Sequence, residues 1–239
     1  MTEENGSTKN EQPSAARRFV MRWPVQLLIL PLFYSLILFL AAGDLAWLWG
    51  WIFVAFYLLS SLLVLLTVRD PALIAERENP PADAQEWDQR LLRLYSLAMI
   101  AVLIVAGLQE RFEWPPAVSL VVHLIGLVGL LGTAVLGAWS MRANTYFSAV
   151  VRIQEDRDHT VVDHGPYRFI RHPGNLSMIL WALGVPLTLG SLWALLPAIL
   201  ATAVVVRRTA LEDATLQVEL PGYDKYARQA RYRLLPAVW

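Results

Sequence analysis

A polar segment, residues 142–175, holds three of the four histidines in the chain, His159, His164 and His172, together with several arginines. It ends in the run Arg-His-Pro-Gly-Asn at 171–175, and a long apolar stretch follows. The first turn of a helix presents unpaired N–H groups and the positive end of the helix dipole, and the arginine and histidine of this run add donors. The segment therefore suits a carboxylate or phosphate of a ligand, or lipid headgroups, and its spacing does not choose between them.

A second cluster, Glu212 and Asp213, follows Arg207 and Arg208 after that apolar stretch. Acidic side chains at this place could bind a cationic group or a ribose diol of a ligand. They could also form ion pairs with the two neighbouring arginines. Residue chemistry alone favours the ion pairs.

Other kinds of active site fit the sequence less well. The histidines and acids of 142–175 match no compact metal-ligand spacing and lie among arginines, so we expect no metal. Ser148 and Ser177 lack the flanking glycines of a nucleophile elbow. The absence of cysteine excludes a thiol nucleophile. His123, inside an apolar stretch, is interpreted as a structural histidine with one or two partners.

The composition excludes an ordinary soluble enzyme. Of 239 residues, 56% are hydrophobic and 17% are charged, against about 25% charged in soluble domains. Such a chain is also too apolar to be disordered, and its net charge of zero gives no indication of a nucleic-acid partner. Ten tryptophans suit a protein anchored at membrane interfaces.

Apolar runs long enough to span a membrane predict an all-α integral membrane protein of about six segments. Four full spans precede a bent hairpin that turns at Leu189-Gly190-Ser191, and the glycines of the fourth span could form a dimer contact. The predicted spans are 23–42, 45–68, 91–109 and 117–141, and the hairpin helices are 176–188 and 191–208. Residues 1–16 are predicted to be a disordered tail, 17–141 a four-helix membrane region, and 142–239 a second region.

Basic residues are distributed very unevenly over this topology. With a cytoplasmic N-terminus, 19 of the 20 Lys and Arg residues fall in cytoplasmic segments, and Arg111 is the exception. This asymmetry predicts that both termini and both polar segments, 142–175 and 207–239, face the cytoplasm. Because the polar segments flank a hairpin, they are expected to meet in space.

The run HTVVDHGPYRFIRHPGN at 159–175, the hairpin, and LEDATL at 211–216 together resemble the isoprenylcysteine carboxyl methyltransferase family, which groups with phospholipid methyltransferases of the same membrane fold. The resemblance covers about residues 140–239. It implies a membrane methyltransferase that uses S-adenosylmethionine without a Rossmann domain, with its site on the cytoplasmic side and its acceptor entering from the bilayer.

The resemblance also implies roles for residues, and makes 142–239 the cofactor-binding catalytic region. The residues expected to be catalytic are Arg171, His172 and Glu212. Those expected to bind the cofactor are His159, Gly165, Tyr167, Arg171, His172, Pro173, Asn175, Glu212 and Asp213. Those expected to bind the acceptor are Asn144, Phe147, Tyr223 and Tyr226. Asn175 and Asp213 depart from the Tyr and Glu that are usual in the family.

Methyl transfer from a sulfonium needs positioning and electrostatics rather than a metal. The acceptor implied is a lipophilic carboxylate or amine, and for an amine His172 or Glu212 could take the proton. Two other functions stay open at this point: an NADPH-dependent membrane reductase of the sterol-reductase type, and a non-enzymatic transporter or scaffold. The bilayer is the expected partner, and the sequence does not give the oligomeric state.

Overall fold

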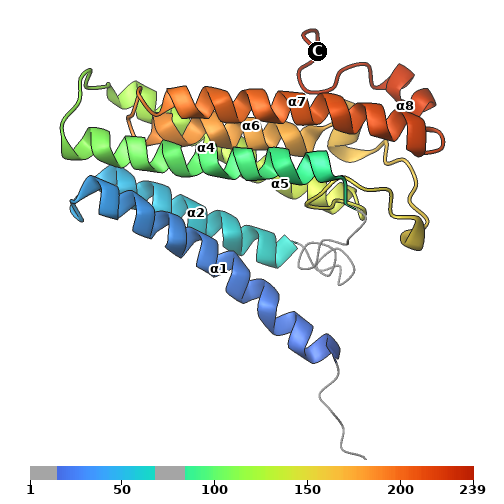
Figure 1. Ribbon diagram of the computed structural model, residues 1–239, viewed down its shortest axis with the longest axis horizontal. Helices are drawn as coiled ribbons and strands as arrows, with labels where there is room; N and C mark the ends of the chain where they lie inside the picture. The colour runs from blue at the N-terminus through green and yellow to red at the C-terminus, as the bar shows by residue number, and fades with distance from the viewer. Residues whose placement is uncertain (1–14, 68–83) are drawn as a thin grey trace, which may run out of the picture.

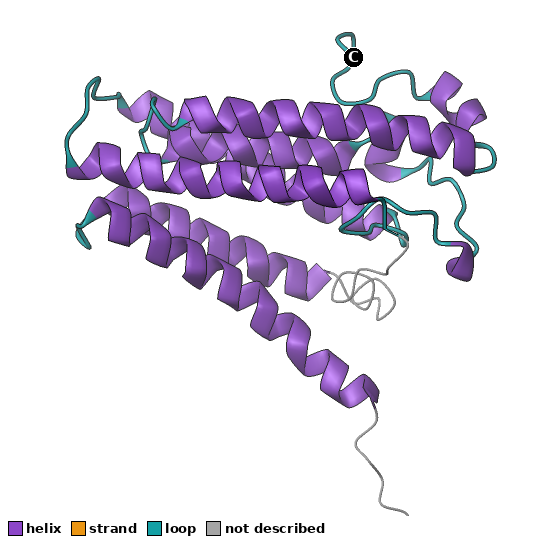
Figure 2. Ribbon diagram, viewed as in Figure 1, coloured by secondary structure: helices purple, strands orange, loops and turns teal. Residues whose placement is uncertain are grey.

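The computed structural model describes residues 15–67 and 84–239, with side chains from residue 28 onward. Within these ranges the chain is helical and has no strand (Figure 2). The α-helices are α1 (Ala15–Ala42), α2 (Leu48–Thr67), α4 (Glu86–Arg111), α5 (Leu120–Ala143), α6 (Pro173–Thr188), α7 (Leu195–Glu219) and α8 (Tyr223–Gln229). Two single-turn 3-10 helices are η1 (Glu155–Arg157) and η2 (Gly165–Arg168). Most of the predicted N-terminal tail lies outside the described residues, and so do residues 68–83, from the end of the second predicted span toward the third.

The long helices run side by side in one bundle (Figure 1). Helix α5 packs mainly on α6, while α4 packs on both α1 and α7. The turns that follow α1, α4 and α6 lie at one end of the bundle, and the loops around η1 and η2 lie at the other end with α8 (Figure 1). The two polar segments that hold the candidate site residues are thereby gathered at one end.

Helices α2, α4 and α5 are each long and apolar enough to cross a membrane. They support a multi-pass membrane protein, whereas the six segments and the cytoplasmic termini remain predictions. The main departure from the predicted boundaries concerns α7, which continues beyond residue 208 to Glu219. The segment after 208 contains no glycine or proline before Pro221, so nothing in it stops the helix, and Glu212 and Asp213 lie inside α7 rather than after it.

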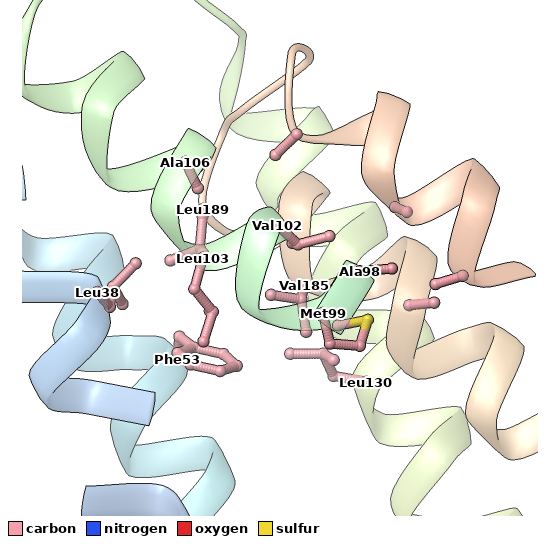
Figure 3. Packing of buried hydrophobic residues seen from close by; sticks show 14 of the residues in the cluster. Leu38, Phe53, Ala98, Met99, Val102, Leu103, Ala106, Leu130, Val185 and Leu189 are labelled. Atoms are coloured by element: carbon pink, nitrogen blue, oxygen red, sulfur yellow. The ribbon is translucent and has the colours of Figure 1, made fainter. Parts of the chain in front are cut away.

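The buried core joins α1, α2, α4, α5, α6 and α7 (Figure 3). Leu38 of α1, Phe53 of α2, Val102 of α4, Leu130 of α5 and Val185 of α6 are each at most 1% exposed. Many other large apolar side chains on the same helices point outward and are exposed. Apolar faces of this extent are rare on soluble monomers and suit contact with lipid.

Helices α5 and α6 approach closely because glycines line their contact. A Cβ atom on Gly126 would lie 2.2 Å from the backbone nitrogen of Thr188, and Gly129 faces Gly184 across the same contact. The glycine stripe is therefore covered by α6 of the same chain, and the dimer contact hypothesised for it is wrong at Gly126 and Gly129. Small residues here let α5 and α6 pack backbone to backbone.

The turn between α6 and α7 lies at Gly190, as predicted. Gly190 has φ +74°, a left-handed conformation that glycine adopts without strain. The Ser191 hydroxyl donates to Oε1 of Gln109 (2.6 Å), which ties this turn to the end of α4. His123 bonds through Nδ1 to the Thr188 carbonyl (2.8 Å) and stacks on Trp49, in keeping with its interpretation as a structural residue.

We expect Gly126→Ala to lower the melting temperature of the purified protein in detergent, because the new methyl group would have to displace the α6 backbone. Overpacking of this kind costs about 1–3 kcal/mol. Gly129→Ala is the matched control, since its Cβ would meet Gly184 at an ordinary 3.5 Å. Equal melting temperatures for the two variants would contradict the close packing described here.

Candidate active site

The two polar segments meet through their backbones. The N–H of Arg171 donates to the Tyr232 carbonyl and the N–H of His172 to the Arg233 carbonyl, both at 2.9 Å. Helix α6 then begins at Pro173, where a proline suits the first helical position because no N–H partner is needed there. The C-terminal tail is thus fixed against the start of α6, as the flanking of the hairpin predicted.

The carboxylate of Asp213 lies at the centre of this meeting point and is fully buried. Oδ1 accepts from the Tyr223 hydroxyl (3.0 Å) and lies 2.8 Å from Nε of Arg171. Oδ2 accepts from Nε of Arg233 and from Nε2 of Gln217, each at 2.8 Å. These donors come from four segments, so one carboxylate joins the start of α6, helices α7 and α8, and the tail after α8.

The guanidinium of Arg171 is occupied by protein groups. Its NH2 donates to Oδ2 of Asp213 (3.1 Å), and its NH1 donates to the carbonyls of Ala227 and Ala230 (3.1 and 3.2 Å) and of Arg231 (3.4 Å). In this arrangement Arg171 binds the end of α8 to α7. A catalytic contact between Arg171 and a ligand stays a prediction.

His172 lies between the two acidic side chains. Its Nε2 is 3.1 Å from Oδ1 of Asp213, and its Nδ1 is 3.6 Å from Oε1 of Glu212. Burial disfavours the charged imidazole, but the two carboxylates outweigh burial and raise the pKa of His172. Burial likewise opposes ionisation of Glu212, yet Arg208 and His172 lower the pKa of Glu212 to about 2. Glu212 is therefore ionised, and the two carboxylates favour the charged form of His172 beside it.

A second ion-pair cluster lies on the other side of Glu212. Asn175 donates through Nδ2 to Oε2 of Glu212 (2.7 Å), and Arg208 donates through NH1 to Oδ1 of Asn175 (2.5 Å). Nε of Arg208 also binds Oδ1 of Asp88 at 2.7 Å. Asp88 was not among the predicted site residues, and its one sequence signal is an acidic residue in the first turn of α4. Arg208 was considered only as an ion-pair partner.

A cavity of about 380 Å³ opens beside these clusters. Its walls come from α4, α5, α6, α7 and α8 and from the loop that follows α5. Ten of the predicted site residues line it: Asn144, Phe147, His159, Tyr167, Arg171, His172, Asn175, Glu212, Tyr223 and Tyr226. The volume falls within the range of about 300–1,000 Å³ that small-molecule sites occupy.

Three predicted site residues do not line the cavity. Asp213 lies behind it, and Pro173 starts α6. Gly165 has φ +61° and lies so close to α5 that a Cβ there would be 2.8 Å from Cβ of Ala143. These three residues shape the site without facing it.

Another part of the cavity wall is built from aromatic and amide groups. Tyr226 donates to the Tyr167 carbonyl (2.7 Å), and Nδ2 of Asn144 donates to the Tyr167 hydroxyl (3.2 Å). The Phe147 ring covers Gly174, where a Cβ would lie 2.7 Å from the ring. Burial, reinforced by nearby arginines, lowers the pKa of His159 to about 4, so this imidazole is neutral.

Part of the chain that forms this site is similar to a known protein family. Residues 124–218, which run from α5 through the cavity loops to α7, match the Isoprenylcysteine carboxyl methyltransferase (ICMT) family. The resemblance inferred from the sequence is confirmed. The ICMT-like region contains most of the cavity wall, while Tyr223, Tyr226 and the tail follow it.

Several proteins similar to part of this chain are named as methyltransferases of the kind that the family describes. A probable protein-S-isoprenylcysteine O-methyltransferase of Oryza sativa subsp. indica is 33% identical over 69 residues, which are 28% of this chain and 36% of the relative. The protein-S-isoprenylcysteine O-methyltransferase of Schizosaccharomyces pombe is 28% identical over 122 residues, 44% of this chain and 52% of the relative. That of Tribolium castaneum is 34% identical over 83 residues, 35% of this chain and 27% of the relative. The chain thus spans about half or less of the relatives it matches.

Asp213→Asn is expected to destabilise the protein strongly, because it leaves Arg171 buried without its counter-charge and His172 with only one of its two carboxylates. Breaking such a buried pair costs about 3 kcal/mol, roughly a 6–12 °C fall in melting temperature for a chain of this size. Asp224→Asn, which breaks the exposed pair with Arg228, is the control, with an expected change below about 0.5 kcal/mol. Similar melting temperatures for the two variants would be evidence against the central place of Asp213.

The stability of the folded protein should also fall at both acidic and alkaline pH. Glu212 has a lowered pKa, so its contribution is present above 4.5, its ordinary pKa, and is lost as the pH falls toward 2. His172 has a raised pKa, so its contribution is present below 6.5 and is lost as the pH rises through its folded pKa. A plot of melting temperature against pH from 3 to 9 should fall at its acidic end and at its alkaline end. His172→Gln should flatten the alkaline limb, and an unchanged limb would refute this assignment.

Proposed function

We propose that the protein is an S-adenosylmethionine-dependent membrane methyltransferase that methylates a carboxylate of a lipophilic molecule. The match of the cavity-forming region to the ICMT family carries this proposal. The relatives are named for O-methylation of S-isoprenylcysteine, and we extend the type of reaction, not the particular substrate, to this chain.

The chemistry of the cavity fits the cofactor. Glu212 offers an ionised carboxylate to a ligand that carries a positive sulfonium and an ammonium group, and Asn175 beside it holds that carboxylate in place. Tyr167 and His159 give aromatic surface and hydrogen-bonding atoms for a nucleoside. These four residues would hold S-adenosylmethionine, which when bound supplies a methyl group attached to a positive sulfur.

The reaction is an in-line displacement. A carboxylate oxygen of the acceptor forms a bond to the methyl carbon while the carbon–sulfur bond breaks, which leaves an ester and a neutral thioether. Opposite charges neutralise in this step, so a poorly solvated site favours it. The protein's part is to exclude water and align the two reactants, and the apolar and aromatic wall of the cavity suits that task.

The ionic state of the site favours a carboxylate over an amine acceptor. An amine must lose a proton, yet both nitrogens of His172 face carboxylates and Glu212 ionises with a pKa of about 2. Neither group is therefore a good proton acceptor at neutral pH. A carboxylate is already ionised and needs no base.

The position of the cavity favours a lipophilic acceptor. Leu92 of α4, Met141 of α5 and Met178 of α6 give the cavity apolar lining, and α4 and α5 are long and apolar enough to cross a membrane. We place the opening on the cytoplasmic side because the basic residues gather there. A reductase or a transporter gains no support from the family that matches, which is a methyltransferase family.

Isothermal titration with S-adenosylhomocysteine in detergent tests the cofactor. We expect binding by the wild type, at least tenfold weaker binding by Glu212→Gln, and unchanged binding by Glu110→Gln, the same substitution at the far end of α4. Binding of NADPH in place of S-adenosylhomocysteine would overturn the proposal.

Incubation with methyl-labelled cofactor and a membrane lipid extract tests the acceptor. A methyl ester releases labelled methanol in mild alkali, whereas an N-methyl group does not. Alkali-labile label in the lipid phase is the expected result, and alkali-stable label would show an amine acceptor instead.

A further inference from the structure

We propose that Asp88 is a positioning residue for the cofactor subsite, which acts through Arg208 on Asn175 and Glu212. The inference rests on the proposed function, since it assigns a role within that site. Asp88 lies on α4, outside the region that matches the ICMT family and 120 residues from Arg208. It does not line the cavity itself.

The contact between Asp88 and Arg208 is two-pronged and buried. Asp88 is fully buried and Arg208 is 7% exposed. Nε of Arg208 donates to Oδ1 of Asp88 (2.7 Å), and its NH2 donates to Oδ2 (3.4 Å). A planar guanidinium held along one edge by two bonds has its remaining NH1 fixed in direction, which a single contact would not achieve.

That fixed NH1 sets the orientation of two cavity residues. It donates to Oδ1 of Asn175 (2.5 Å) and to Oε2 of Glu212 (3.3 Å). Because Asn175 presents its oxygen to Arg208, its amide nitrogen must face Glu212, to which it donates at 2.7 Å. The three side chains form a closed ring of contacts that places the Glu212 carboxylate at the cavity wall.

Asp88 also holds a neighbouring wall of the same cavity. Its Oδ2 accepts from the backbone N–H of Val151 (2.8 Å), and the Val151 carbonyl accepts from the N–H of Gln85 (3.1 Å). Val151 lines the cavity, together with the residues on either side of it. One carboxylate therefore fixes both the polar group and a wall of the site relative to each other.

General stability is a weak explanation for such a residue. Desolvating two charges offsets most of their attraction, and apolar residues of similar size often stabilise a protein equally well. The ion pair with Asp88 instead fixes the orientation of the Arg208 guanidinium, which in turn orients the side chains of Asn175 and Glu212. A positioning role predicts a specific loss of ligand affinity beyond any loss of stability.

The test compares Asp88→Asn with Gln109→Ala in the full-length protein in detergent. Gln109 is buried at the other end of α4, about 32 Å away, where it binds the α6–α7 turn, so its loss weakens α4 packing without touching the site. Titration with S-adenosylhomocysteine should give a Kd about tenfold weaker for Asp88→Asn and within twofold of the wild type for Gln109→Ala. Equal affinity of Asp88→Asn and wild type would overturn the inference.

A double-variant cycle separates positioning from a global effect. If Asp88 acts on Glu212, the Kd of Asp88→Asn/Glu212→Gln should rise by clearly less than the product of the two single effects. Multiplicative effects would overturn the inference. If Asp88→Asn does not fold, Arg208→Lys replaces it, because lysine keeps the charge but loses the fork, and an unchanged Kd would again count against the inference. A wild type that binds no S-adenosylhomocysteine would overturn the proposed function and this inference together.

Discussion

The carboxylate of Asp213, buried without access to water, is the interaction on which the site depends. A bare carboxylate in such surroundings is costly, so it must be surrounded by donors, and Arg171, Arg233 and Tyr223 supply them from separate segments. No short segment could provide all of them. The requirement to satisfy one charge thus fixes the start of α6, the polar end of α7 and the tail in a single arrangement.

The membrane part of the bundle supplies the rigidity that this arrangement needs. Glycine contacts hold α5 against α6, and a similar close approach at Gly107 holds α4 against α1. Because packed helices do not deform continuously, the ends of α4, α5, α6 and α7 arrive at fixed positions. Two polar clusters then join those ends, one centred on Asp213 and the other on Asp88.

Several features could be predicted from the sequence because they depend on local pattern. The lengths of the apolar runs predict the long helices, and a glycine predicts the turn at 190. The order of polar and apolar segments predicts that 142–175 and 207–239 meet in space. The different positions of the Glu212 and Asp213 side chains could not be predicted. Neighbouring residues on a helix point about 100° apart, so one faces the cavity and the other faces the tail, and that follows only from how α7 is rotated in the bundle. Asp88 was missed because its partner lies 120 residues away.

The bonds between the Arg171 side chain and the tail carbonyls bridge 60 residues, and this spacing sets the order of events during biosynthesis. At about 5–20 residues per second, several seconds pass between the synthesis of Arg171 and that of its last partners. In that interval the carbonyls that accept from Arg171, and the Arg233 side chain that binds Asp213, have not yet been synthesised. The Asp213 cluster can therefore be completed only after residues 227–233 have been synthesised, when helices α6 and α7 are already part of the chain.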